Sequence, residues 1–251
     1  MTMGLDVSSF KFLLHKSKEA KFKNTLTLGR QNCHTALKHL KNAGWEKDYI
    51  PNYIDDVCIN LFGSYPNIQS LDNSTYENAT IIHNMNNPID SNNKKESFDT
   101  VLDLGTLEHV FNVKQSILNA IYFLKIGGRI LHILPSNNFG GHGFYQFSPE
   151  LFYSLYTEEN GFEQTEVFVK SIGSSNSYYK VKKPENGKRG LITSIYPVYV
   201  CVSSKKVRDV KELTVQQSDY VNLWESSDLD EAGEIFNSLG GIPYWDKWPI
   251  K

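Results

Sequence analysis

Short apolar runs alternate with stretches of helical spacing along the first part of the chain. Residues 24–28 (NTLTL) form a β-prone run that stops at Gly29, and apolar residues then recur at helical spacing over 33–43. A less regular helical stretch at 49–62 precedes a second β-prone run at 67–71 (NIQSL). The pattern predicts a strand, a turn, a helix and a strand, with one extra helix in the crossover.

The clearest block lies between residues 98 and 134. Residues 98–104 (FDTVLDL) predict a strand, 113–124 a helix with one apolar face, and 129–134 (RILHIL) the next strand. Gly127-Gly128 is expected to end the helix. This order is a βαβ unit, and a further strand is predicted before it at 79–85.

Three more elements are predicted after residue 147. Ser148-Pro149-Glu150 indicates a helix start, because Ser caps the first turn and Pro is favoured at the first helical position; this helix runs to about residue 157. Two β-rich runs follow at 162–169 and 191–202, separated by the polar, Lys-rich 174–189. With no helix between them, we expect these runs to form an antiparallel pair at one edge of the sheet.

The repeated β–α alternation predicts an α/β fold with a mostly parallel sheet. We expect one domain over 1–203, which includes an N-terminal helix at 8–20, and a C-terminal helical extension over 204–251 packed on the same domain. Helical stretches at 215–224 and 229–239 precede an aromatic end (YWDKW). Such an end should pack on the domain or on a second copy of the chain, so a homodimer is one expectation.

Composition and charge exclude several classes of protein. The 251 residues carry 26 basic and 28 acidic side chains, and the basic set holds 22 Lys against 4 Arg, so we expect no nucleic-acid partner. No apolar run reaches the roughly 18 to 20 residues of a membrane helix, and charged residues interrupt the N-terminal stretch where a signal peptide is apolar. We therefore expect a cytoplasmic protein without a membrane partner. The three widely spaced cysteines form no disulfide or zinc motif.

Ligand sites of parallel α/β sheets lie at the carboxyl ends of the strands, so the residues after each strand are candidates. Gly29 allows close backbone approach, but the positions where a G-x-G-x-x-G dinucleotide motif continues hold no glycine. Asp72 follows the second strand, where an acid binds the two hydroxyls of a ribose. Asn84 and Met85 follow the third, where an amide and an apolar side chain would flank an adenine ring. Each is also typical of an ordinary turn.

The fourth strand and the block after it resemble a known family. Phe98-Asp99 opens the strand, Leu107-Glu108-His109-Val110 follows it, and after the helix come Leu124-Lys125-Ile126-Gly127-Gly128, a strand and Pro135. This succession is similar to the motif IV to motif V block of class I S-adenosylmethionine (SAM) dependent methyltransferases, which is an FD strand, LEHV, a helix, LKPGG, a strand and Pro. The match covers about forty continuous residues.

The resemblance implies a Rossmann-like sheet of seven strands with an antiparallel edge strand, helices on both faces, SAM as cofactor and S-adenosylhomocysteine (SAH) as product. It gives the cofactor-binding residues as Gly29, Arg30, Gln31, Asp72, Asn84, Met85, Asp103 and Leu104. The chain departs from the family at the reduced glycine loop, at the enlarged first crossover and at Ile126, where the family has Pro.

The segment after the fifth strand predicts the acceptor site. Residues 136–147 hold glycines, amides, a histidine and aromatic residues, a composition that suits a pocket wall better than a packing segment. A hydroxyl acceptor needs a base with a pKa near neutral, and His142 is the first candidate and His109 the second. The residues expected to face the acceptor are Glu108, His109, His142, Tyr145 and Gln146. The alternative is that His142 caps backbone groups of the loop.

A divalent metal is compatible with this turn but is not predicted. Some relatives in the family carry E-x-x-E-H here and hold a divalent ion with it, whereas this chain has Gly105 in place of the first carboxylate. Glu108 and His109 alone are too few ligands unless His142 or the acceptor completes the set. The competing interpretation is that Glu108 and His109 orient the turn.

We therefore expect a SAM-dependent O-methyltransferase that acts on a small-molecule acceptor. The resemblance implies an acceptor oxygen of hydroxyl or phosphate type on a sugar or activated metabolite in surface polysaccharide biosynthesis. Two alternatives stay open. An NAD-dependent nucleotide-sugar enzyme shares the alternating sheet but requires a three-glycine turn that this chain lacks, and a non-catalytic partner subunit with the SAM fold is compatible with the reduced glycine loop.

Overall fold

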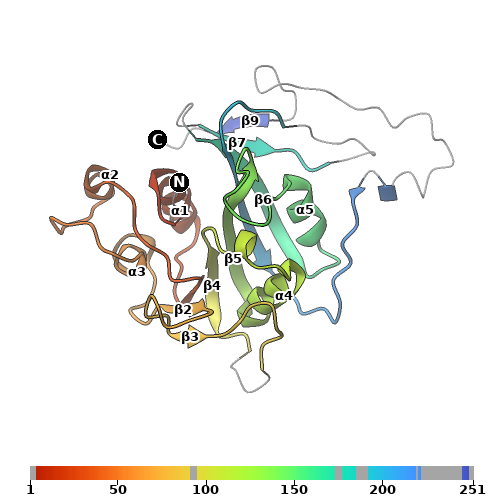
Figure 1. The fold of residues 1–251 in the computed structure, drawn as a ribbon, viewed down its shortest axis with the longest axis horizontal. Helices are drawn as coiled ribbons and strands as arrows, with labels where there is room; N and C mark the ends of the chain where they lie inside the picture. Colours follow the sequence, from red (N-terminus) through yellow and green to blue (C-terminus); the bar gives the residue numbers. More distant parts are fainter. Residues whose placement is uncertain are drawn as a thin grey trace.

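One twisted sheet runs through the molecule in the computed structural model, which describes residues 4–90, 95–172, 177–184, 192–218 and 220–221 and the backbone of 245–248 (Figure 1). The nine strands of the described chain follow the order β3-β2-β1-β4-β5-β8-β6-β7-β9. Their bounds are β1 Thr25–Leu28, β2 Gln69–Asp72, β3 Ile81–Ile82, β4 Phe98–Asp103, β5 Leu124–Asn137, β6 Phe162–Ser171, β7 Tyr178–Val181, β8 Val198–Lys206 and β9 Trp245–Trp248.

The strand order confirms the Rossmann-like prediction. Strands β3, β2, β1, β4 and β5 are mutually parallel, and 3-2-1-4-5 is the order of the doubly wound α/β fold. The order reverses between β1 and β4, and ligands of such sheets bind at that switch point. The expected antiparallel pair is β8 with β6, but β8 also pairs with β5, so the antiparallel strand lies inside the sheet. Strands β7 and β9 extend this side beyond the seven strands expected.

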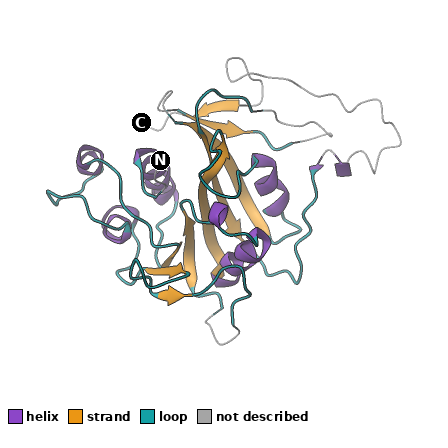
Figure 2. Cartoon of the chain, in the orientation of Figure 1, coloured by secondary structure: helices purple, strands orange, loops and turns teal. Residues whose placement is uncertain are grey.

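Helices cover both faces of the sheet, as predicted. Helices α1 (Val7–Glu19), α2 (Leu37–Asn42) and α3 (Asp55–Val57) lie on one face, and α4 (Val113–Phe123) and α5 (Pro149–Leu155) on the other (Figures 1 and 2). A π-helical turn, η1 (Cys58–Phe62), continues α3, and a 3-10 turn, η2 (Leu107–His109), follows β4. Each face has its own apolar core, so the central strands are buried on both sides.

Helix capping confirms two local predictions. The Asp6 side chain accepts a hydrogen bond from the Ser9 N–H at 2.7 Å, and α1 corresponds to the helix expected at 8–20. At the start of α5, the Ser148 side chain accepts from the Glu150 N–H at 3.2 Å, and Pro149 occupies the first turn.

Gly127-Gly128 does not end a helix, and this prediction was wrong. Helix α4 already ends at Phe123, because Leu124 is extended and pairs with Phe98 across the β4–β5 boundary. The two glycines lie inside β5, where the register with β4 shifts between Phe98 and Thr100. Gly127, with φ of 85°, supplies the backbone conformation that this irregularity requires.

Two other boundaries differ from the sequence prediction, and one strand was not predicted. Helix α2 covers only part of 33–43, because the Cys33 N–H donates to the Asn52 carbonyl and Cys33 forms a bridge with Leu5. Strand β8 begins at Val198 and runs to Lys206, later than the predicted 191–202. Strand β7 lies within the stretch predicted as a polar loop, since Tyr178 and Val181 are buried beneath their polar neighbours.

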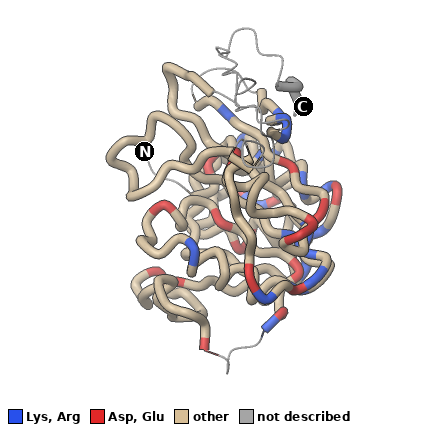
Figure 3. Tube along the Cα trace, turned by 90° about the vertical axis from the view of Figure 1, so that its right-hand side faces the viewer, with Lys and Arg blue, Asp and Glu red and all other residues tan. Residues whose placement is uncertain are grey.

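Most of the predicted C-terminal extension lies outside the described residues, so its packing on the domain stays a prediction. The helix expected at 229–239 lies outside the described residues, as does most of the one at 215–224. The backbone of β9 adds to the sheet beside β7. No helix of the described chain is long and apolar enough to cross a membrane. Acidic and basic positions are interspersed in the view of Figure 3, and the three cysteines are buried and unpaired with one another.

Candidate active site

A cavity of about 560 Å³ opens at the carboxyl ends of the strands on both sides of the switch point. The turn after β1 contributes Gly29 to its wall, β2 contributes Asp72, and the turn after β4 contributes Thr106. His109 and His142 line the same cavity. The cavity thus brings together residues predicted for the cofactor and two residues predicted for the acceptor, His109 and His142.

The turns after β1 and β4 are bonded to each other. Gly29 has a φ of 70°, and a Cβ placed there would lie 2.7 Å from Thr106 Oγ1, so only glycine fits. The Gln31 side-chain amide donates to the Leu28 carbonyl at 2.8 Å and to Thr106 Oγ1 at 3.0 Å. Thr106 Oγ1 in turn donates to the Leu28 carbonyl at 2.7 Å. Gln31 therefore lines the cavity but uses its amide group to fix the two turns.

Asp72 presents a carboxylate with bonding capacity left for a ligand. Its Oδ2 accepts from the Arg30 N–H at 3.1 Å and its Oδ1 from the Asn73 N–H at 2.6 Å. A carboxylate has about four acceptor positions, so these two bonds leave room for two hydroxyl donors. This is the arrangement that the ribose prediction requires.

The Arg30 side chain turns to the loops around the cavity. Its guanidinium donates to the Asn78 carbonyl at 3.1 Å, pairs with Asp55 at 3.4 Å and lies 4.4 Å from the centre of the Tyr53 ring. Burial and the neighbouring Arg30 charge act in opposite directions on Asp55, and burial prevails, so the pKa of Asp55 is raised. Arg30 thus contributes its backbone N–H to the Asp72 contact and its side chain to loop structure.

Asn84 and Met85 line the cavity from the segment that follows β3. The Asn84 side-chain oxygen accepts from the Asn86 N–H at 3.0 Å and from its side-chain amide at 2.8 Å, so part of its capacity serves the local turn. Met85 is buried, and its carbonyl accepts from Ser116 and Asn119 of α4. Both residues line the cavity, as the adenine prediction requires.

Asp103 and Leu104 lie beneath the cavity and not in its wall. Leu104 is fully buried in the core on the α1 face. Asp103 Oδ1 accepts from the Thr106 N–H at 3.0 Å, and Oδ2 lies 2.9 Å from His132 Nδ1. His132 Nε2 lies 2.6 Å from the Tyr156 hydroxyl, whose pKa is raised by burial. This buried chain of three side chains holds the turn that carries Thr106 in place.

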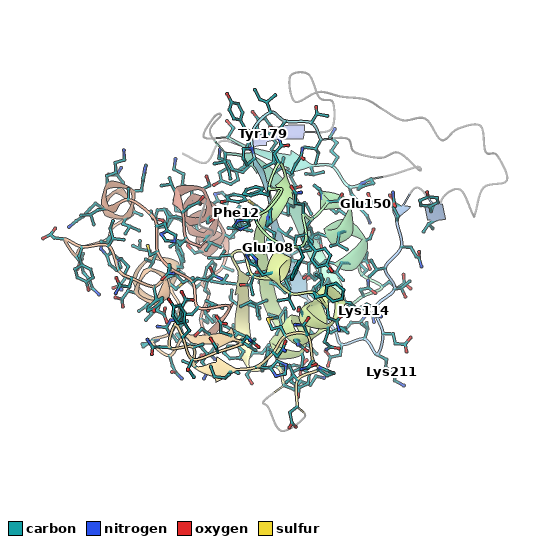
Figure 4. All side chains as sticks on the ribbon, viewed as in Figure 1. Phe12, Glu108, Lys114, Glu150, Tyr179 and Lys211 are labelled. Carbon is teal, nitrogen blue, oxygen red and sulfur yellow. The ribbon has the colours of Figure 1, made fainter. Side chains whose placement is uncertain are left out.

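Glu108, His109 and His142 form a cluster on the acceptor side of the cavity. Glu108 lies near the middle of the molecule (Figure 4), and its side chain is fully buried. Its Oε1 lies 3.5 Å from His142 Nε2 and 3.8 Å from His109 Nε2. Within the described chain, neither Glu108 oxygen nor His142 Nε2 has a hydrogen-bond partner. Buried polar atoms are rarely left in this state, which points to a ligand or proton that joins them.

Burial sets the ionisation of this cluster. Burial and the nearby Asp103 charge raise the pKa of Glu108 to about 8. Burial lowers the pKa of His109 and of His142, and the His109 charge lowers that of His142 further. Near neutral pH the two imidazoles are therefore largely neutral and the Glu108 carboxyl is largely protonated.

Tyr145 and Gln146 hold the acceptor loop instead of facing the cavity. The Tyr145 hydroxyl donates to the Phe111 carbonyl at 2.9 Å, and the Gln146 side-chain oxygen accepts from the Phe139 N–H at 2.7 Å. The loop also contacts the turn after β4, because the Phe144 N–H donates to the Glu108 carbonyl at 2.7 Å. Both side chains therefore position His142.

The same cluster has the donor set of a divalent cation site. One ligand atom from each of Glu108, His109 and His142 lies within 4.8 Å of the other two. Two imidazoles and one carboxylate suit a transition metal ion, and Glu108 has no competing hydrogen bond among the described residues. His142, which the sequence left open as a third ligand, supplies the third donor atom of this cluster.

Comparison with known proteins gives distant structural similarity. No protein-family model matches the chain, and no curated protein is similar to it in sequence. A SAM-dependent methyltransferase from Thermotoga maritima, described as a possible histamine N-methyltransferase, aligns with a TM-score of 0.43 at 16% identity over 79% of this chain and 89% of that one. The 1,6-didemethyltoxoflavin-N1-methyltransferase of Burkholderia thailandensis, solved with its substrate and SAH, gives 0.43 at 13% identity over 79% and 77%. A SAM-dependent methyltransferase from Clostridium acetobutylicum gives 0.32 at 13% identity over 80% and 74%.

Sequence reasoning missed three residues that shape the site. Thr106 joins the two cavity turns, His132 pairs with Asp103, and Gly143 lies against Glu108, where a Cβ would come within 2.8 Å of the Glu108 carbonyl oxygen. His132 had a readable signal, because it is the one polar residue within ILHIL, the apolar run that follows Arg129. Thr106 and Gly143 act through tertiary contacts, so the local sequence pattern gave no indication of their roles.

Proposed function

We propose that this protein is a SAM-dependent methyltransferase that transfers a methyl group to an oxygen of a small-molecule acceptor. The observation that carries the proposal is a single cavity at the switch point with Asp72 and the Gly29 turn on one side and the Glu108, His109 and His142 cluster on the other. A nucleoside-type cofactor fits the first side, and a reacting hydroxyl fits the second.

The cofactor side is supported by three features of the cavity. The Asp72 carboxylate would accept the two ribose hydroxyls, the Gly29 turn would let the backbone approach the cofactor closely, and Asn84 with Met85 would flank the adenine. In a dinucleotide-binding turn, the position of Gln31 would hold a second glycine. Here the Gln31 side chain occupies the turn, which disfavours a pyrophosphate. This favours SAM over NAD.

The acceptor side supplies a base. When bound, SAM would supply the methyl group: the acceptor oxygen would bond to the methyl carbon as the carbon–sulfur bond breaks, and SAH would leave with the electron pair on sulfur. The hydroxyl proton passes to His142 Nε2, which is buried and free of a competing hydrogen bond within the described chain. His109 stands beside it, with ring centres 5.2 Å apart, as the second candidate.

A divalent cation in the same cluster is an alternative to this base chemistry, because a His142 Nε2 bound to a metal ion has no lone pair left for a proton. Glu108, His109 and His142 would hold it, and when bound it would polarise the acceptor oxygen as a Lewis acid. The residues fit the ion because their ligand atoms converge and those of Glu108 and His142 are otherwise unpartnered in the described structure.

The finer acceptor class follows the family resemblance. We propose a hydroxyl or phosphate-type oxygen of a sugar or activated metabolite, as used in surface polysaccharide biosynthesis. Its support on this chain is that resemblance together with the position of His142, which comes from the loop after β5 and lines the cavity. Turnover on a panel of sugars, sugar nucleotides and sugar phosphates tests this class.

The test of the cofactor is calorimetric titration with SAH and, separately, with NAD. We expect micromolar SAH binding, no NAD binding, and a roughly ten- to hundredfold weaker SAH affinity in Asp72→Ala, from the loss of hydrogen bonds to a charged acceptor. Asp48→Ala is the matched control, because Asp48 is exposed and remote from the cavity. NAD binding without SAH binding would replace the proposal with the nucleotide-sugar enzyme. SAH binding without turnover on any acceptor would favour the non-catalytic partner subunit.

A further inference from the structure

Two phenylalanines stand out by their exposure. Phe111 is 75% exposed and Phe144 is 69% exposed, whereas every other phenylalanine of the described chain is buried. Burying such a side chain stabilises a fold, so leaving two of them exposed forgoes a substantial stabilisation. Single exposed apolar residues are common, but these two touch each other, with ring centres 6.4 Å apart at 90°.

The two rings come from different loops that are firmly held. Phe111 follows η2, and Phe144 belongs to the loop after β5. The Phe144 N–H donates to the Glu108 carbonyl, and the Tyr145 hydroxyl donates to the Phe111 carbonyl. The Tyr145 ring contacts both Phe144 and the buried Phe147, at 6.3 Å in each case. The exposed pair is therefore anchored to the core and does not owe its exposure to a loose loop.

The pair adjoins the acceptor side of the cavity. Val110 and His142 both line the cavity, one residue before Phe111 and two residues before Phe144. Glu108, whose carbonyl holds Phe144, also carries the buried carboxyl of the reacting cluster. An acceptor that placed its oxygen at His142 would extend toward these two rings.

We propose that Phe111 and Phe144 form a subsite for a planar ring carried by the acceptor. Edge-to-face rings present apolar surface to a flat ligand ring, and aromatic contacts are favourable beyond the area they bury. Two side chains offer far less area than the roughly 1,000 Å² of a stable protein interface, which disfavours a protein partner. This inference rests on the proposed methyltransferase function and deepens it.

A planar ring has two chemical sources here. One is a simple aromatic hydroxyl compound, and the other is the base of a nucleotide-activated sugar. The shared chemistry is the flat π face, and the two sources are separated by the probes below.

The experiment measures binding of three probes to the SAH-loaded protein by calorimetry: catechol, uridine diphosphate and glucose 1-phosphate, the last of which has no planar ring. We expect at least one of the two ring probes to bind. Phe111→Ala and Phe144→Ala should each weaken the affinity for that probe about ten- to hundredfold, the range of base–aromatic stacking. Phe144→Leu, which keeps apolar volume but removes the ring, should behave nearly as Phe144→Ala does. Ile126→Ala is the control, because Ile126 is exposed at the opposite end of β5.

The outcomes separate this inference from the proposed function. SAH affinity should stay within about twofold in all four variants, since none of these side chains lines the cofactor side. Failure of both ring probes to bind, unchanged ring binding in the two Ala variants, or full rescue by Phe144→Leu would overturn the planar-ring subsite while SAH binding persists. Loss of SAH binding in the unmodified protein would overturn the proposed function instead.

Discussion

Glu108 lies in an unfavourable environment for a charged side chain. Its carboxyl group is fully buried, and the described chain gives neither oxygen a hydrogen-bond partner. An ionised carboxylate in this position costs several kcal/mol, so the group is kept neutral or is joined by a counter-charge. The nearest candidates to share its proton are the two imidazoles at 3.5 and 3.8 Å.

The role of His142 as base is tested by His142→Ala. We expect turnover to fall about 10²- to 10⁴-fold, the usual contribution of a general base, while SAH affinity changes little. Steady-state kinetics and SAH calorimetry measure the two effects separately. His39→Ala on α2 is the control. Retained turnover in His142→Ala would transfer the role to His109.

At the scale of elements, the contact between the acceptor loop and η2 positions the cluster. Gly143 allows this contact, because a Cβ there would lie 2.8 Å from the Glu108 carbonyl oxygen. Gly140, in the same loop, has open space around its Cβ position. The two glycines therefore form a matched pair of positions.

Gly143→Ala should displace the loop and lower turnover about tenfold or more, since a misplacement of about 1 Å costs as much as 10²-fold. Gly140→Ala should leave turnover close to that of the unmodified protein. Both variants should bind SAH with unchanged affinity, because the loop contacts only the acceptor side. Equal turnover of the two variants would show that the loop contact does not position His142.

The sequence predicted elements whose signals are local and missed those decided by tertiary contacts. The β4–α4–β5 block and the Ser148 cap carry strong periodicity and capping signals, and both are present. Strand β7 was missed because its short run, YYKV, lies in a Lys-rich segment and is recognised only through its partner β6. At the site, Gly29, Asp72 and His142 were placed by strand-end reasoning, whereas the Asp103–His132 pair spans two strands and could not be read from either.

At the scale of the whole molecule, the raised pKa of Glu108 couples folding to pH. The folded protein holds the proton up to about pH 8, whereas a carboxyl with its ordinary pKa of 4.5 releases it much earlier. The folded state therefore binds more protons between these values. The contribution of the Glu108 proton to the free energy of unfolding is fully present below about pH 4.5. It falls by at most about 1.4 kcal/mol per pH unit as the pH rises, and it is lost once the pH has passed about 8.

Glu108→Gln should remove this dependence, because the amide stays neutral at every pH. Urea unfolding with EDTA present, at several pH values from about 6 to 9, should show the free energy of unfolding of the unmodified protein falling relative to that of the variant. Glu159→Gln, at an exposed carboxyl, serves as the control. Parallel curves for the unmodified protein and Glu108→Gln would contradict the burial of an uncharged Glu108.

The bonds that join the turns after β1 and β4 have a further consequence for ligand capture. Gln31 and Thr106 already tie the two walls of the cofactor side together through the Leu28 carbonyl. A ligand that enters this space finds its walls preorganised and loses little affinity to ordering them. Cofactor association should therefore follow a single kinetic phase that is linear in ligand concentration, as expected for rigid recognition without a slow closing step.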